Sequence, residues 1–226
     1  MTAVVSIRRY PVKSMGGEAL NSVEIDVRGL VGDRAYAVRD MDSRLAAGKN
    51  TKRHVRRDGV FEFTAATHPE GVVVTGPGAR HGLVGEPELD AWLSDVLVAD
   101  VAIAPETDVK HFDDGAVSVI GTATLAWCER ELGVDADPRR LRANLVVETT
   151  EAFEEEAWDG EVRIGSAVLR TAGRIERCRT IDLAQDGVDT ETSWLKALGR
   201  ERDLRVAVYL EVVTPGQVSV GDEFRA

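Results

Sequence analysis

The residues best suited to chemistry lie in Gly173–Asp182, GRIERCRTID. Within this segment Cys178 stands between Arg177 and Arg179. A free cysteine has a pKa of about 8.5, and adjacent cations stabilise its thiolate, which is both a nucleophile and a metal ligand. The segment therefore predicts a thiolate site. An extended backbone would turn both neighbouring arginines away from the sulfur, so an exposed cysteine without a function is the alternative.

A second cationic stretch is Arg139–Asn144, RRLRAN, which precedes an apolar strand. In an extended backbone, alternation places Arg140, Arg142 and Asn144 on one face. Arginine is suited to bidentate phosphate binding, and an amide can both donate and accept hydrogen bonds toward a heterocycle. A surface ladder paired with nearby carboxylates explains the same spacing.

A third group lies near the start of the chain. Lys13 and Ser14 follow Pro11, and Asp33 and Arg34 come twenty residues later in the sequence. A lysine beside a serine in a loop is typical of a phosphate contact and also of an ordinary surface pair. Arg34 either faces a ligand or pairs with Asp33.

The charge distribution favours an anionic small-molecule partner. The 226-residue chain has a net charge of −11, but residues 1–60 carry 12 basic and 7 acidic groups, whereas residues 61–138 carry 3 and 15. An acidic protein that gathers its basic residues in places focuses positive potential there, although pairing with surface carboxylates gives the same asymmetry. The overall charge argues against nucleic acid as a partner.

No long apolar run appears that predicts a membrane span, and the N-terminus lacks the apolar core of a signal peptide. We therefore expect a cytoplasmic protein with no membrane partner.

The two cysteines differ in their surroundings. Leu125, Cys128 and Leu132 share the apolar face of a predicted helix, TATLAWCEREL, so Cys128 is expected to pack in the core. The spacing of the cysteines fits neither a disulfide framework nor a zinc site. The four histidines lack metal-ligand spacing and are expected to be structural or solvent-facing.

Many short strands separated by glycine and proline predict a mainly β, barrel-like α+β fold with two or three helices. The segment 88–97 has helical periodicity, and the basic segment 43–57 is expected to be a loop.

Taken in order, these motifs resemble the MOSC family, named after the C-terminal part of molybdenum-cofactor sulfurase. The similarity is to the two-part form with an N-terminal β-barrel, the group that includes the amidoxime-reducing component. It implies an N-terminal β-barrel-like subdomain over residues 1–85 and a MOSC domain over 86–226. It rests on Tyr10-Pro11-Val12-Lys13-Ser14, Gly29-Leu30, Asp33-Arg34, Arg140–Asn144, Trp158, Ile164-Gly165, Arg177-Cys178, Asp182 and Val218–Asp222.

The resemblance implies a molybdenum cofactor (molybdopterin), a pyranopterin with a phosphate and a dithiolene that holds the metal. Molybdenum is thiophilic, so a cysteine thiolate is a suitable protein ligand. Cys178 would be that ligand and the catalytic residue. The implied cofactor-binding residues are Lys13, Ser14, Arg34, Arg142 and Asn144 for phosphate and pterin, with Arg177 at the cofactor and Arg140 as a lesser candidate.

The leading hypothesis is an oxidoreductase that reduces small N-hydroxylated substrates. The chain has too few cysteines for an iron–sulfur cluster and no nucleotide-binding loop, so a separate electron-donor protein is expected. One alternative is a sulfur carrier or transferase that passes a Cys178 persulfide to a sulfur acceptor. Another is a non-catalytic module that binds the molybdenum cofactor.

Overall fold

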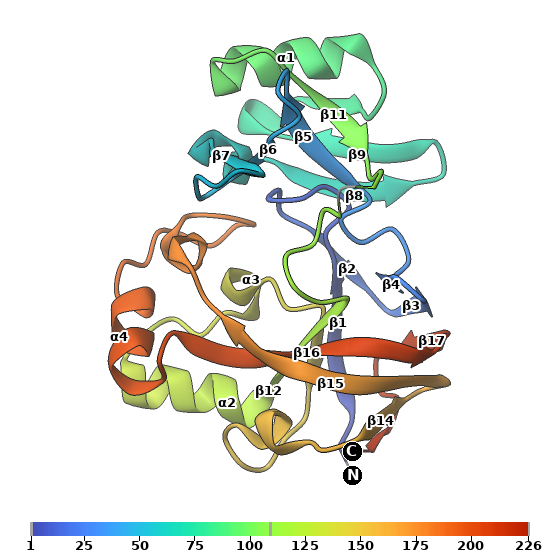
Figure 1. The fold of residues 1–226 in the computed structure, drawn as a ribbon, viewed down its shortest axis with the longest axis vertical. Coiled ribbons are helices and arrows are strands. Elements are labelled where there is room, and N and C mark those ends of the chain that lie inside the picture. The colour runs from blue at the N-terminus through green and yellow to red at the C-terminus, as the bar shows by residue number, and fades with distance from the viewer. Residues whose placement is uncertain (1, 109, 226) are drawn as a thin grey trace.

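The chain forms two packed units, one above the other in Figure 1. The computed structural model describes residues 2–108 and 110–225. None of the helices formed by these residues has the length and hydrophobicity of a transmembrane helix.

An eight-stranded sheet organises the lower unit. Only β12 and β13 pair in parallel within it, among the strand pairs of the described residues. The first strand of the chain lies beside β13, so the N-terminal residues complete a sheet built from the C-terminal half. The strand order is β18 (Phe224–Arg225), β14 (Glu161–Ile164), β15 (Ala167–Glu176), β16 (Arg205–Thr214), β12 (Val117–Gly121), β13 (Leu145–Val147), β1 (Val4–Arg9) and β2 (Glu18–Leu20).

Side-chain alternation gives this sheet a core on each face. In β13, Leu145 and Val147 enter one core, whereas Val146 enters the other. The first core is completed by a small sheet of β3 (Ser22–Asp26), β4 (Gly29–Leu30) and β17 (Gly216–Ser219). The second core packs against α2 (Thr122–Trp127), α3 (Pro138–Leu141) and α4 (Trp194–Glu201).

The upper unit has two further sheets over a separate core. The helix α1 (Pro87–Leu97) places Leu89, Trp92 and Leu93 in that core, and β11 contributes Val101 and Ile103. Helix α1 and strand β11 follow residue 85, where the resemblance implied a domain boundary, and they pack in the same core as residues that precede it. The strands are β11 (Val101–Pro105), β5 (Tyr36–Asp40), β6 (Leu45–Ala47) and β7 (His54–Arg56) in one sheet, and β10 (His81–Leu83), β9 (Gly71–Thr75) and β8 (Thr64–His68) in the other.

The mainly β fold class is confirmed, with four α-helices in the described residues where two or three were expected. The segment 43–57 is not a simple loop, because β6 and β7 form within it and pair in parallel. Helix α2 continues as a π-helical turn over Cys128–Leu132 and ends at Gly133, whose φ of 66° suits a glycine. Cys128 is fully buried in the core, as expected.

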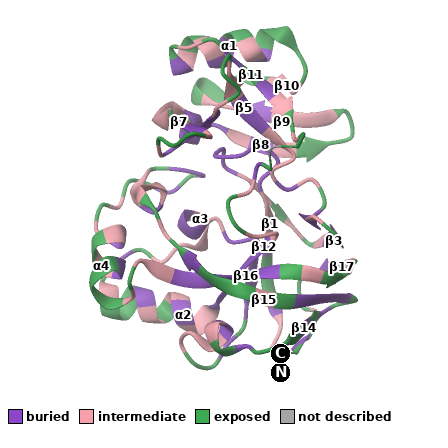
Figure 2. Cartoon of the chain, in the orientation of Figure 1, coloured by how far each residue is buried: buried purple, intermediate pink, exposed green. Residues whose placement is uncertain are grey.

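The central strand β16 allows buried and exposed valines to be compared within one strand. Its first residues are mostly buried and its last residues are mostly exposed (Figure 2). Val208 is 0% exposed and Val213 is 38% exposed. We predict that Val208→Ala lowers the free energy of unfolding by about 2 kcal/mol, because buried methyl groups are lost and a cavity remains. Val213→Ala should cost less than about 1 kcal/mol. Urea denaturation of both variants measures the difference, and equal losses would contradict this assignment of the core.

Candidate functional site

A cavity that is open to solvent receives its walls from both units. The upper unit contributes Ala47, Gly48 and Phe61, and the lower unit contributes Ser118 and Ile175. All eight site residues predicted from the sequence line this cavity. They are Lys13, Ser14, Arg34, Arg140, Arg142, Asn144, Arg177 and Cys178.

The cavity wall is strongly basic although the chain is acidic. Among the described residues, six basic side chains line it against two acidic ones, Asp113 and Glu176. Burial lowers the pKa of both Arg142 and Arg177 to about 10, so both remain charged at neutral pH. The site therefore concentrates positive charge on partly buried side chains, where the attraction of an anion is stronger than on the open surface. The basic residues are Lys13, Arg34, Lys49, Arg140, Arg142 and Arg177.

Three of the predicted residues have left-handed backbone conformations. The φ angles of Ser14, Arg34 and Arg142 are 70°, 49° and 51°. Such angles are uncommon for residues with side chains, and they collect at ligand sites, where the surrounding structure enforces them.

The predicted extended alternation of Arg140, Arg142 and Asn144 is wrong. Asp137 caps a helical turn and Pro138 begins it, and Arg142 then ends α3 in the left-handed conformation. The chain thus turns sharply instead of running straight into β13. The three side chains nevertheless line the same cavity.

Tyr10 contacts two of the cavity arginines and was missed as a site residue. The central guanidinium carbons of Arg34 and Arg142 lie 4.8 and 4.3 Å from the centroid of its buried ring. Arg34 pairs with the Asp33 carboxylate, and the Arg142 guanidinium donates to the Met15 carbonyl at 2.7 Å. A ring face attracts cations, so Tyr10 holds two like charges close together.

Arg140 and Asn144 differ in how many of their side-chain hydrogen bonds are made within the protein. The Arg140 side chain is almost fully buried, and its Nη2 donates to Asp135 at 3.2 Å. Its Nε and Nη1 atoms are buried and find no partner among residues 2–108 and 110–225. The Asn144 oxygen accepts from the Ser118 backbone N–H and hydroxyl, and its nitrogen donates to the Arg8 carbonyl. Arg140 thus offers free donors to a ligand, whereas Asn144 joins β12, β13 and β1.

Cys178 is exposed and lines the cavity. Its Sγ donates to the Thr180 hydroxyl at 3.4 Å. Arg177 turns inward, where its guanidinium donates to the carbonyls of Leu141 and Val206, and Arg179 turns away to pair with Asp58 at 2.7 Å. The two flanking arginines therefore point in different directions, whereas an extended backbone would have turned both to the same side. The backbone is not extended beyond Cys178, because Arg179 begins a 3-10 turn, and each arginine anchors the segment that carries the thiol.

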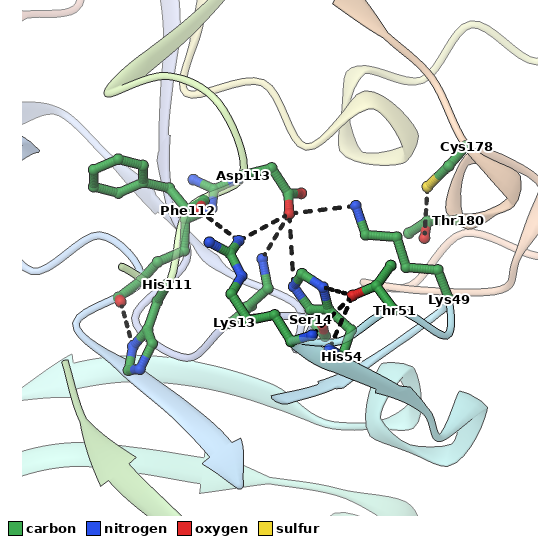
Figure 3. Close-up of polar contacts among 12 residues, drawn as sticks. Lys13, Ser14, Lys49, Thr51, His54, His111, Phe112, Asp113, Cys178 and Thr180 are labelled. Carbon is green, nitrogen blue, oxygen red and sulfur yellow. Dashed lines mark hydrogen bonds and ion pairs between the residues drawn. The ribbon is translucent and has the colours of Figure 1, made fainter. Parts of the chain in front are cut away.

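Lys13 is a buried cation of the cavity that faces a carboxylate. Its side chain is 8% exposed and its Nζ lies 3.2 Å from Asp113 (Figure 3). Burial lowers the pKa of Lys13 to about 8, although the Asp113 carboxylate opposes the shift. Ser14 beside it donates its hydroxyl to the Ala46 carbonyl at 2.9 Å, which fixes the loop against β6.

Several cavity residues were not predicted. Phe61, Phe112 and Tyr209 supply aromatic walls, and Lys49 and Asp113 supply charges. The only sequence signal was the basic character of segment 43–57, because these residues meet through long-range packing. His54 and His111 are both buried, and neither faces solvent.

The two cysteines should differ in reactivity. Burial raises the pKa of Cys128 to about 12 and removes it from solvent, whereas Cys178 is exposed. We predict that iodoacetamide at pH 8 alkylates Cys178 and leaves Cys128 unmodified in the folded protein, because only an accessible thiolate reacts. Peptide mass spectrometry measures this, with urea-unfolded protein as the control in which both react. Protection of Cys178 in the folded state would contradict the exposed site.

Lys13 should contribute to the pH dependence of stability. The folded protein releases the Lys13 proton near pH 8, whereas the unfolded chain keeps it up to the ordinary lysine pKa of 10.5. Stability therefore rises between these pH values, and its full gain is present only above the unfolded-state pKa. From pH 8 to pH 10, the free energy of unfolding of the wild type should rise by about 2 kcal/mol relative to Lys13→Met. The Lys49→Met variant, whose lysine is 39% exposed, should follow the wild type. Parallel pH profiles for wild type and Lys13→Met would contradict the shift.

Comparison with known proteins supports the resemblance seen in the sequence. Residues 106–225 match the MOSC domain family, and residues 1–75 match the MOSC N-terminal beta barrel domain family. A 91-residue stretch is 35% identical to molybdenum cofactor sulfurase of Bos taurus and 32% identical to that of Homo sapiens. It covers 37% of this chain and 10% of each of those proteins, so the chain spans only a small part of these relatives.

The solved structure of the YUAD protein from Bacillus subtilis has a TM-score of 0.55 at 16% sequence identity, covering 99% of this chain and 94% of that chain. At this identity the similarity concerns the fold. Because the MOSC match alone extends over more than half of the residues, the chain belongs to the MOSC family.

Proposed function

We propose that the cavity binds a molybdenum cofactor and that the protein is an oxidoreductase. One observation carries the proposal: the eight residues that the sequence motifs indicate, from separate parts of the chain, line a single cavity of a MOSC-family protein. Chance convergence of so many residues is improbable, because they come from both units.

The chemistry of the cavity fits such a cofactor. A pyranopterin phosphate is anionic and planar, and the cavity offers basic side chains together with aromatic walls from Phe61, Phe112 and Tyr209. The unpartnered Nε and Nη1 of Arg140 are an independent indication, because buried donors without partners are costly unless a ligand satisfies them. Lys13, Ser14, Arg34 and Arg142 would hold the phosphate and the pterin.

Cys178 is the donor that suits the metal. In the described residues no group of three or more His, Cys, Asp or Glu side chains gathers as a metal site, so a single protein thiolate would join ligands that the cofactor brings. Thr180 orients the sulfur, and the inward guanidinium of Arg177 and the outward one of Arg179 hold its backbone. Asn144 and Tyr10 would act as positioning residues.

When bound, the cofactor would supply two-electron chemistry that removes an oxygen atom from a small N-hydroxylated substrate. The protein would orient the substrate at the cavity mouth beside Cys178. Electrons would come from a separate donor protein. The proposed substrate class and electron donor go beyond membership of the MOSC family and rest on the resemblance to the amidoxime-reducing component.

A second candidate is a sulfur carrier. The relatives with sequence identity to this chain are named molybdenum cofactor sulfurases, and the exposed thiol of Cys178 suits a persulfide. This function needs Cys178 but no bound metal.

We predict about one molybdenum per chain after expression in a host that makes the cofactor. Cys178→Ser should lower metal content severalfold while the far-UV circular dichroism spectrum is unchanged, because the exposed side chain contributes little to folding. Metal analysis by mass spectrometry, with fluorescence detection of the released pterin, measures both components.

Cys128→Ala is the matched control and should keep the metal, although its loss of packing lowers stability. Wild-type protein without molybdenum or pterin, but with a 32 Da adduct (one sulfur atom) on Cys178, would contradict the oxidoreductase proposal and favour the sulfur carrier.

A further inference from the structure

A cluster of four nitrogen donors surrounds one carboxylate at the edge of the cavity (Figure 3). The Asp113 Oδ1 atom lies 3.2 Å from Lys13 Nζ, 3.5 Å from Lys49 Nζ, 3.7 Å from an Arg53 nitrogen and 3.8 Å from His54 Nε2. We call Lys13, Lys49, Arg53 and His54 the donor cluster. Its members come from the loop after β1 and from the segment 48–56, none of which lies near Asp113 in the sequence.

The carboxylate is far less confined than the two buried members of the donor cluster. The Asp113 side chain is 43% exposed, whereas those of Lys13 and His54 are 8% and 5% exposed. Its chain neighbours are held, since the His111 backbone N–H donates to Glu106 and the Phe112 carbonyl accepts from Arg53 at 3.1 Å. Rotation of the Asp113 side chain alone would therefore empty the centre of the donor cluster without moving the backbone.

His54 presents a buried N–H toward that centre. The Thr51 hydroxyl oxygen accepts from the backbone N–H groups of Arg53 and His54, so its hydrogen is available to the His54 Nδ1 atom at 3.0 Å. Burial, reinforced by the Lys13 charge, lowers the pKa of His54 to about 4, so the ring is neutral at pH 7. A neutral ring that accepts at Nδ1 carries its hydrogen on Nε2. That Nε2 is buried, and no described residue forms a hydrogen bond with it.

The charges of the cluster do not balance. Lys13, Lys49 and Arg53 carry three positive charges and meet one carboxylate. Burial raises the pKa of Asp113, but the charges of Lys13 and Lys49 outweigh it and hold that pKa well below its usual range. A phosphate group carries nearly two negative charges at pH 7 and offers three acceptor oxygens. It would match three cations and one N–H donor better than a single carboxylate does.

We propose that the donor cluster is a subsite for a phosphate group. In the absence of phosphate the Asp113 carboxylate contacts the four donors, and the phosphate displaces it on binding. Lys49, Arg53 and His54 thereby become ligand-binding residues, and Asp113 sets the affinity by competition. The phosphate belongs either to the cofactor or to a phosphorylated substrate. Only the first of these sources rests on the proposed function.

Binding of inorganic phosphate to the full-length, cofactor-free protein tests the subsite by isothermal titration calorimetry. Asp113→Asn keeps the side-chain shape and removes the competing charge, so it should bind phosphate about tenfold more tightly than wild type. Asp114→Asn is the matched control, because this exposed neighbour lies outside the cluster, and it should bind as wild type does.

Lys49→Met and Arg53→Met, made in the Asp113→Asn background, should each weaken phosphate binding about tenfold. His54→Gln keeps an N–H donor and should bind more tightly than His54→Leu. Thermal denaturation identifies any variant that fails to fold. The proposal is overturned if Asp113→Asn binds phosphate no more tightly than Asp114→Asn, or if the lysine and arginine replacements leave its affinity unchanged.

The source of the phosphate follows from the same titration on protein loaded with the cofactor. Loss of phosphate binding on loading assigns the subsite to the cofactor, and retained binding assigns it to a phosphorylated substrate. Phosphate binding to the cofactor-free protein needs no metal. The protein could therefore contain molybdenum and yet fail to bind phosphate at this subsite, or bind phosphate there and contain no molybdenum.

Discussion

The structure depends on holding several like charges together in one partly dehydrated cavity. Guanidinium groups repel each other and lose hydration on burial, so each needs acceptors fixed by the fold. Arg34 has the Asp33 carboxylate, Arg142 has the Met15 carbonyl, and Arg177 has the carbonyls of Leu141 and Val206. These anchors are mostly backbone oxygens, which neutralise little charge. The cavity therefore keeps a net positive potential that an acidic chain otherwise lacks.

The same requirement explains why the site lies where the two units meet. The loop after β1 supplies Lys13 and Ser14, which are fixed to β5 and β6 of the upper unit, while Arg142 and Cys178 come from the lower unit. Gly48 brings the units into close contact, since a Cβ atom there would lie 2.7 Å from the Thr180 hydroxyl. The position of the thiol thus depends on the packing of the upper unit against η5 (Arg179–Asp182).

Much of this arrangement could be predicted from the sequence, and the reasons for the failures are physical. Periodicity distinguished the buried Cys128 from the exposed Cys178, and motif order indicated the family. Alternation failed at Arg140 and Arg142 because Asp137 and Pro138 start a helical turn, a capping signal that outweighs proximity to a strand. The donor cluster was missed because its residues meet Asp113 only through contacts between segments distant in the sequence, which no local pattern encodes.

The left-handed backbones at the site carry a further consequence for how the protein responds to selection. Ser14, Arg34 and Arg142 sit in conformations that glycine adopts with less strain, so replacement by glycine would relax the main chain while removing a hydroxyl or a charge. A screen that selects for thermal stability alone would then favour replacement of these three residues by glycine, at the expense of the site. Engineering of heat-resistant forms should keep them fixed and seek its gains in the two cores of the eight-stranded sheet.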